Sequence, residues 1–306
     1  MKNDKKVLSI GKTLKTKRRI FIVCMLALPV LQYLVFFVYV NISSITMSFQ
    51  VRTIDSVKVS LGNYRRFFNE LGLGEIGYAV RNSFWVGLND LFLLFISLIL
   101  SYFFFKKIPG RGVFKVIFFL PQIISIVIFI MVFKYMFDPD MGIVNVILKS
   151  IGITDLPEWF APASQWQMPL ILLYCLWVGT GYNILIMGGA MANLPEEVIE
   201  YSRLEGVGMG RELFEIIIPM IWPTVSVGIL GSITVMFTLF IQVDLMTSGG
   251  ALHQSTTISY MINSIVRGGT DLEWASALGV CFTIIAAPII IITRKLLNKA
   301  AEHFGF

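Results

Sequence analysis

The sequence predicts an all-α membrane protein with six transmembrane helices and one further cytoplasmic helix between spans 4 and 5. Three observations support this class. Hydrophobic residues make up 56 % of the 306 residues and charged residues only 14 %, whereas soluble domains carry about 25 % charged residues. The apolar residues gather in six long runs. Within these runs apolar and polar residues do not alternate as they do in barrel strands.

Each apolar run is close to or longer than the ~20 residues that a helix needs to cross a bilayer core. Helices are expected because lipid offers no partner to an unpaired backbone N–H or C=O. Together the runs form one transmembrane domain over 20–293, flanked by an N-terminal segment 1–19 and a C-terminal segment 294–306. We place the spans at residues 20–42, 82–105, 114–137, 168–190, 217–243 and 275–293.

Basic residues beside the spans predict the orientation, because Lys and Arg are enriched in cytoplasmic flanks. The basic N-terminus 1–19 holds eight, the 106–115 loop holds four and no acid, and the 294–306 segment holds three. The 43–81 loop carries five and favours the opposite orientation. Since the flank of the first span usually dominates, we expect both termini in the cytoplasm.

No catalytic or metal site is predicted. Cys24, Cys175 and Cys281 all lie inside apolar runs, where cysteine behaves as a small apolar residue. No G-x-x-x-x-G-K-[ST] nucleotide motif is present. A membrane enzyme is disfavoured because His253, the only histidine away from the C-terminus, has no acid–base cluster around it. We expect no cofactor in this chain.

The 191–216 segment is acidic and rich in glycine. Pro195 suits the first turn of a helix, so we expect a helix from about 196 to 205 that ends at Gly206. A second helix restarts near Arg211 and runs into the next span. The glutamates are expected to be exposed; a solvated amphipathic loop would have the same charge pattern. They are Glu196, Glu197, Glu200, Glu205, Glu212 and Glu215.

The stretch EYSRLEGVGMGRELFEIIIPMIWP, residues 200–223, resembles the signature loop of binding-protein-dependent ABC importer permeases. The family pattern reads E-A-A, then G, then a hydrophobic residue followed by P. Glu200, Tyr201 and Ser202 stand for E-A-A, Gly206 for the glycine, and Pro219 for the proline. The chain departs from the family at Tyr201 and Ser202, where alanines are usual, and at Glu205, where aspartate is favoured.

Three further stretches resemble the carbohydrate-uptake branch of this family, of the maltose type. They are LGNYRRFF at 61–68, FDPDMGIVNVILKSIGI at 137–153, and WVGTGYNILIMGGAMANLPEEVIEYSRLEG at 177–206. The matches occur in the family's order and cover most of the chain.

The resemblance implies that the 191–216 segment is a coupling helix that docks on a cytoplasmic ATPase. Glu200 would make the charged contact and Gly206 would be the hinge. The implied partners are a second homologous permease subunit, two ATPase subunits that hold ATP and Mg, and an extracellular solute-binding protein. No nucleic acid is implied, and the expected location is the bacterial cell membrane.

Two spans carry candidate residues for a substrate pathway. In the fourth, Trp177, Gly179, Tyr182 and Asn183 resemble the family's substrate face, although interfacial or lipid-facing packing would explain the aromatic residues equally well. In the fifth, one helical face carries small and hydroxylated residues, which is typical of close helix packing as well as of a pathway. These are Thr224, Gly228, Gly231, Val235, Thr238 and Gln242, with Ser232 beside them.

Asp90 lies inside the second predicted span, where a charge is costly and is usually paired or functional. Lys134 lies near the same outer end of the third span. We expect the two to form a structural ion pair, and contact between Asp90 and a substrate is the alternative.

These observations predict one permease subunit of an ATP-driven importer for a sugar or oligosaccharide. The scarcity of charges in the spans favours an uncharged solute. A permease for another solute, such as a glycerol-phosphate or a polyamine, is the first alternative. A proton-coupled secondary carrier is the second, although it would not need the coupling loop.

Overall fold

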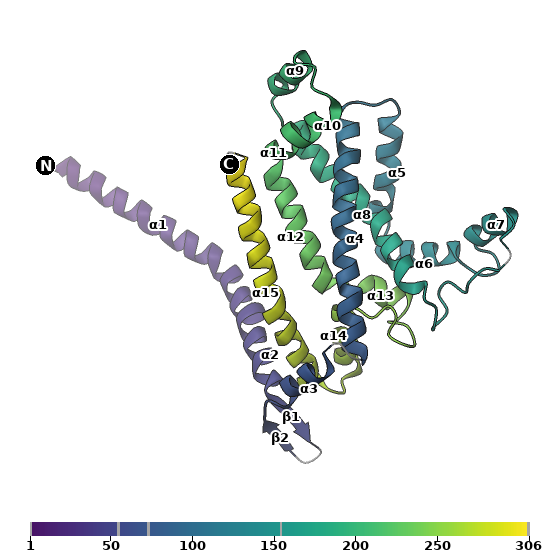
Figure 1. Cartoon of the computed structure of the whole chain (residues 1–306). Coiled ribbons are helices and arrows are strands. Elements are labelled where there is room, and N and C mark those ends of the chain that lie inside the picture. Colours follow the sequence, from purple (N-terminus) through teal and green to yellow (C-terminus); the bar gives the residue numbers. More distant parts are fainter. Residues whose placement is uncertain (1, 54–55, 72–73, 154, 305–306) are drawn as a thin grey trace. The chain divides into compact units, whose positions relative to one another are not determined.

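The computed structural model describes residues 2–53, 56–71, 74–153 and 155–304, and most of them are helical (Figure 1). The prediction of a helical protein is therefore confirmed. The chain divides into two compact units. Unit 1 comprises Met1–Arg65 and Asp271–Val280, and unit 2 comprises Arg66–Thr270 and Cys281–Phe306.

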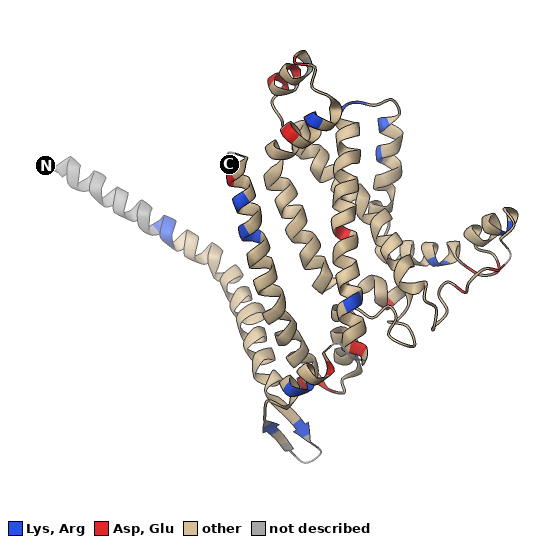
Figure 2. Ribbon diagram, viewed as in Figure 1, with Lys and Arg blue, Asp and Glu red and all other residues tan. Residues whose placement is uncertain are grey.

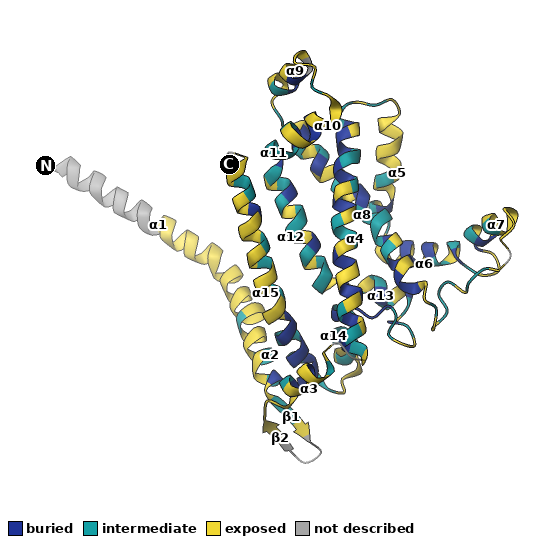
Figure 3. Ribbon diagram, viewed as in Figure 1, coloured by how far each residue is buried: buried dark blue, intermediate teal, exposed yellow. Residues whose placement is uncertain are grey.

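Unit 1 begins with a long helix whose first part is basic and whose second part is the first predicted span. It consists of α1 (Lys2–Gln32), a π-helical stretch η1 (Tyr33–Tyr39) and α2 (Val40–Ser48). The most apolar stretch within Lys17–Ser48 has no buried residue (Figure 3). Such a surface suits lipid or another membrane subunit, because a water-exposed apolar patch of this size is unfavourable.

A short hairpin that the sequence did not predict follows α2. Strand β1 (Gln50–Thr53) pairs antiparallel with β2 (Ser56–Val59), with Gln50 opposite Val59. The next helix, α3 (Gly62–Glu70), begins beside it.

Side-chain contacts within unit 1 fix this hairpin. The Asn63 amide donates to the backbone carbonyls of Ser48 and Gln50 at 3.3 and 2.9 Å. Arg52 on β1 forms an ion pair of 2.8 Å with Glu273, whose side chain is only 4 % exposed. The buried carboxylate thus has a cationic partner, which burial of a charge requires.

Unit 2 contains the remaining helices, and the last helix, α15 (Leu272–His303), begins in unit 1 and ends in unit 2. In chain order the others are α4 (Gly74–Phe105), α5 (Arg111–Ile123), α6 (Ile126–Met136), α7 (Ile143–Ser150), α8 (Gln167–Ala192), α9 (Glu196–Leu204), α10 (Met209–Arg211), η2 (Glu212–Ile217), α11 (Ile218–Met220), α12 (Trp222–Thr238), α13 (Ile241–Met246) and α14 (Ile258–Gly268).

Four helices in the described part of the chain are long and apolar enough to cross a membrane. They are Lys17–Ser48, α4, α8 and α15. Two further pairs pass the same test only when each bent pair is counted as one span, which gives up to six. The pairs are α5 with α6, and the Met209–Met220 segment with α12.

The two bent pairs correct the expectation of straight helices over 114–137 and 217–243. The chain bends by 109° between α5 and α6, because the backbone is extended at Ile124 and Ser125. The second pair bends by 83° at Ile221, just before Pro223. Proline has no N–H and fits only the first turn of a helix, so a new helix starts there.

The fifth predicted span, 217–243, also ends earlier than expected. Helix α12 stops at Thr238 because Leu239 is extended, and Gln242 lies on the separate helix α13. The expectation that Gln242 continues the polar face of the same helix is therefore wrong.

Helix α4 packs between α8 and α12, and glycines allow the close approach. A Cβ atom at Gly179 on α8 would lie 2.5 Å from Leu93, and one at Gly228 on α12 would lie 2.6 Å from Leu94. Both leucines are on α4 and are buried. Small residues at such crossings are the usual way in which membrane helices approach one another.

Buried polar side chains hold the irregular segment between α13 and α14. The Asn82 amide on α4 donates to the carbonyls of Gln254 and Thr256 at 2.8 and 2.9 Å. The Ser83 hydroxyl accepts the N–H of Ile258 at 3.0 Å, and Ser255 donates to Gln167 at 3.0 Å. Non-helical backbone at membrane depth needs such protein partners.

The packing of α8 against α5 gives a testable prediction. A Cβ atom at Gly181 would collide with the backbone carbonyl of Phe118, which cannot move aside as a side-chain end can. We expect Gly181→Ala to cost about 1–3 kcal/mol and to lower the apparent Tm of the detergent-purified protein by several degrees. Gly188→Ala on the same helix is the control, because no atom lies within 4 Å of its added methyl group. Equal Tm values for the two variants would contradict the close packing.

Candidate functional site

A cavity of about 720 Å³ opens between four helices of unit 2. Asp90 on α4 and Gln122 on α5 form part of its wall. This size is typical of ligand pockets, which measure about 300–1,000 Å³. The remaining lining residues are Gly179, Tyr182, Asn183, Ile186 and Met187 on α8 and Pro223, Thr224, Val227, Gly228, Gly231 and Val235 on α12.

A smaller cavity of about 220 Å³ shares Asp90, Gly179 and Val235 with the first. It extends along α4 and α8 to Asn89 and Cys175 and reaches Gln242 on α13. The two spaces are therefore neighbours along one wall of α4, α8 and α12.

Helical periodicity explains why these residues meet. Gly179, Tyr182 and Asn183 are spaced i, i+3 and i+4 on α8, and Thr224, Gly228, Gly231 and Val235 repeat in the same manner on α12. Of the predicted pathway residues, Gln242 lines the smaller cavity. Those that line the larger cavity are Gly179, Tyr182, Asn183, Thr224, Gly228, Gly231 and Val235.

The other three predicted pathway residues have different surroundings. Trp177 packs in an aromatic cluster, with its ring centroid 5.1 Å from that of Phe129. Ser232 is buried, and its hydroxyl lies 3.2 Å from the Gly228 carbonyl. The Thr238 hydroxyl donates to the Thr234 carbonyl at 3.1 Å. None of the three belongs to the described lining of either cavity.

The larger cavity offers uncharged hydrogen-bonding groups. Asn183 donates its amide N–H to the Gly179 carbonyl at 3.1 Å, and Gln122 donates to the Val178 carbonyl. Within the described residues, the side-chain oxygens of Asn183, Tyr182 and Thr224 have no protein hydrogen-bond partner. The cavity can therefore hydrogen-bond a polar solute and also contact its apolar parts.

Asp90 lines both cavities and is half-buried. The Ser232 hydroxyl on α12 interacts with its carboxylate. The alternative considered for Asp90, contact with a substrate, stays a prediction.

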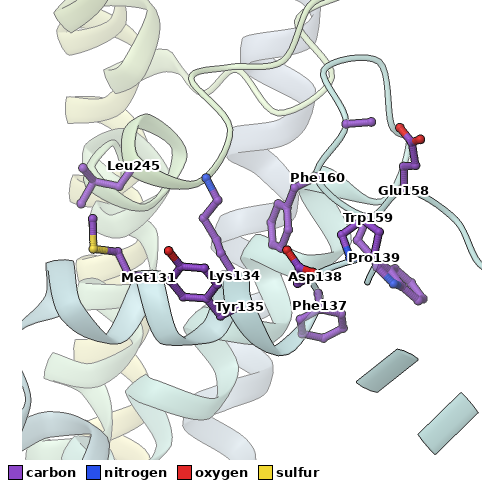
Figure 4. A pocket seen from close by; sticks show the side chains of 11 residues that line it. Met131, Lys134, Tyr135, Phe137, Asp138, Pro139, Glu158, Trp159, Phe160 and Leu245 are labelled. Atoms are coloured by element: carbon purple, nitrogen blue, oxygen red, sulfur yellow. The ribbon is translucent and has the colours of Figure 1, made fainter. Parts of the chain in front are cut away.

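The expected ion pair between Asp90 and Lys134 is not made in this structure. Lys134 lines a different cavity of about 470 Å³, together with Asp138, Trp159 and Phe160 (Figure 4). Its ammonium nitrogen lies 5.8 Å from the centroid of the Phe160 ring. The 109° bend between α5 and α6 explains the difference. The prediction placed Lys134 at the same membrane depth as Asp90 because it assumed one straight helix.

The signature segment forms a helix that ends at a left-handed glycine. Gly206 has φ of +68°, and the Val207 N–H bonds to the Ser202 carbonyl at 3.0 Å. This hydrogen bond and the positive φ define a Schellman motif, which favours glycine at that position. The expected helix end at Gly206 is therefore observed.

Helix α9 exposes most of the signature residues. Its acidic residues are coloured red on the ribbon of Figure 2, and Glu200 and Tyr201 are both exposed. Ser202 is buried and donates to the Ile199 carbonyl at 2.8 Å. Pro219 lies in the first turn of α11, where a missing N–H is tolerated.

One glutamate of this segment is buried, in contrast to the expectation that all are exposed. The Glu212 side chain is 3 % exposed and forms an ion pair of 2.5 Å with Lys106. The Tyr102 hydroxyl donates to the same carboxylate at 2.9 Å. Since Tyr102 lies on α4 and Lys106 follows its last residue, these contacts attach the segment after α9 to the end of α4.

Two comparisons with known proteins agree. Residues 93–302 match the family described as binding-protein-dependent transport system inner membrane component. The chain is 25 % identical over 287 residues to the alpha-glucoside transport system permease protein of Rhizobium meliloti, covering 92 % of this chain and 82 % of that protein. It is 24 % identical over 254 residues to the sn-glycerol-3-phosphate transport system permease protein of Pectobacterium atrosepticum, covering 82 % and 83 %.

A solved structure shares the fold. It belongs to a bacterial ABC transporter involved in the import of the acidic polysaccharide alginate. The TM-score is 0.79 at 20 % identity, and the match covers 94 % of this chain and 99 % of that one.

The long apolar helices are those of a multi-pass membrane protein, and the cavity lies between four helices of unit 2. The family match extends over most of that helical region. The chain belongs to the binding-protein-dependent transport system inner membrane component family, and it is thus a transporter permease and not an enzyme.

Sequence reasoning did not identify several residues of the site. Gln122 lies beside Pro121 in an apolar run, and a polar residue there is a usable signal. Lys106 was assigned only to the basic flank that sets orientation. Its buried partner Glu212 is 106 residues away in sequence, so no local pattern relates the two.

The buried contact between Lys106 and Glu212 gives a prediction. Removal of one partner leaves an unpaired buried charge, which typically costs about 3–5 kcal/mol. We expect Glu212→Gln and Lys106→Met each to lower the stability strongly, and the double variant to lose less than the sum. Thermal unfolding of the purified protein measures all three. Glu215→Gln is the control, because its contact with Arg211 is exposed and 3.3 Å long and should be worth about 0–1 kcal/mol. Purely additive losses would contradict the pair.

Proposed function

We propose that this chain is one of the two permease subunits of an ATP-driven importer and forms half of the pathway for a sugar or oligosaccharide. The observation that carries the proposal is the cavity of about 720 Å³ lined by α8 and α12 in a chain of this family. The solute would be delivered by an extracellular binding protein, as the family's description indicates.

In this proposal each bent pair counts as one span, so the chain crosses the membrane six times. The basic residues beside the first span support a cytoplasmic location for both termini. The segment 191–216 between α8 and α12 then lies in the cytoplasm, and the 138–166 region lies outside. The two permease subunits would enclose the solute between them.

Energy would come from two cytoplasmic ATPase subunits that bind ATP and Mg. Helix α9 is the proposed coupling helix, since Glu200 is exposed and available to a basic residue of the ATPase. The buried Lys106–Glu212 contact supports this role, because it joins the chain after α9 to the end of α4. A displacement of α9 would therefore reach a helix that lines the cavity.

The lining groups support an uncharged, hydroxyl-rich solute. The amide of Asn183 and the hydroxyls of Tyr182 and Thr224 can bond to sugar hydroxyls. The Tyr182 ring can also stack against a sugar ring. One relative named above is an alpha-glucoside permease. An alpha-glucoside belongs to the same class of solute.

A glycerol-phosphate permease is the second candidate, and the named relative from Pectobacterium atrosepticum supports it. A phosphate would be expected to meet Lys, Arg or a helix N-terminus. Neither cavity has a lysine or arginine among its described lining residues. The lining therefore favours the neutral solute.

The proposed topology is tested by cysteine labelling in intact cells and in inside-out vesicles. In a chain without its native cysteines, we expect Glu158→Cys to react with an impermeant thiol reagent only from outside. Glu197→Cys should react only from inside. The reverse pattern would contradict the orientation and, with it, the coupling role of α9.

The proposed function is tested by reconstitution. The chain is combined in liposomes with the proposed second permease, ATPase and binding protein of the same importer, and ATP-dependent uptake of labelled neutral oligosaccharides is measured. We expect Glu200→Ala to weaken retention of the ATPase about tenfold, because a hydrogen bond to a charged group contributes about 1.5–3 kcal/mol. Gly206→Val should reduce uptake, because valine disfavours the φ of +68°.

Glu197→Ala, which removes another exposed carboxylate from α9, is the matched control and should retain the ATPase. Normal uptake and normal ATPase retention in both the Glu200 and Gly206 variants would show that α9 is only a solvated segment. If no neutral oligosaccharide is taken up while glycerol-phosphate is, the second candidate replaces the first.

A further inference from the structure

Asp90 occupies a distinctive place on the wall of the proposed pathway. It is one of three residues shared by the two adjoining cavities, and the other two, Gly179 and Val235, have no charge. The Asp90 side chain therefore borders both cavities.

The described lining of the two cavities contains no opposing charge. Its polar side chains are amides, hydroxyls and one thiol, and Asp90 supplies the single formal charge. The Ser232 hydroxyl that interacts with the carboxylate is neutral. Lys134, the cation predicted to neutralise Asp90, lines another cavity.

An uncompensated charge in such a place acts over a longer range than one on the surface. The surrounding helices are apolar, so the effective dielectric constant is lower and salt screens the charge less. Fixed carboxylates along membrane pathways attract cations and repel anions. The cost of keeping a charge there also indicates a functional role.

We infer that Asp90 is a specificity-determining residue that makes this pathway select neutral and cationic solutes and exclude anionic ones. The inference rests on the proposed function, since it assigns a solute class to the same cavity. Asp90 would exclude anions such as glycerol-3-phosphate and acidic alginate, for which two of the similar proteins are named.

The electrostatic potential in the pathway can be measured without knowledge of the solute. Val235, which lines both cavities, is replaced by cysteine in a chain whose three native cysteines are changed to alanine. The assembled importer is purified in detergent, where both sides of the pathway are reachable. The rates of modification by a cationic trimethylammonium-ethyl and an anionic sulfonato-ethyl methanethiosulfonate are then compared.

We expect the ratio of cationic to anionic rates to fall about tenfold in Asp90→Asn, since a nearby unit charge acts oppositely on the two reagents. Asp90→Glu should retain the ratio. Glu158→Gln removes an exposed carboxylate from the separate cavity of Figure 4 and should also leave the ratio unchanged. An identical ratio with and without the Asp90 carboxylate would overturn the inference.

The outcome also separates this inference from the proposed function. If Val235→Cys reacts readily but its rate ratio does not depend on Asp90, the cavity is accessible and only the charge selectivity is refuted. If Val235→Cys reacts with neither reagent in the folded complex, the cavity is not a pathway, and the proposed function and the inference both fail.

Discussion

The close approach of α4 to α8 and α12 is the constraint on which the rest of unit 2 depends. Leu93 and Leu94 on α4 occupy the space that a side chain at Gly179 or Gly228 would fill. Because of these glycines, α8 and α12 both pack closely against α4. The cavity lies beside this contact, and both glycines also form part of its wall.

The breaks in the helices are stabilised by polar side chains placed where backbone groups lose their helical partners. Asn82, Ser83 and Gln167 bond to the segment that follows α13. The buried Glu212 holds the segment after α9 against α4 in the same manner. These contacts join the proposed coupling helix to the helix that carries Asp90. In this arrangement one continuous helix, α4, connects the end that contacts Glu212 with the wall of the cavity.

Much of the site was predictable because it depends on local periodicity. Gly179, Tyr182, Asn183 and Val235 were identified from the faces of two apolar helices and from the family resemblance, and all four line the cavity. The sequence spacing of Trp177 did not distinguish it from these residues. Its contact with Phe129 in the structure shows that it belongs to the aromatic core. The straight-helix assumption failed at Ile124 and Ser125, and the placement of Lys134 failed with it.

The sequence by itself determined the helical membrane class, the family and the helix end at Gly206. Apolar run length, ordered motifs and the conformational preference of glycine are properties of short stretches of chain. Only the tertiary structure decided which groups surround Asp90 and Glu212. Their partners come from helices distant in sequence, and the angles at the helix breaks set which side chains meet. A charged residue in an apolar stretch of sequence indicates that the residue is either paired or functional. The three-dimensional packing determines which groups surround it.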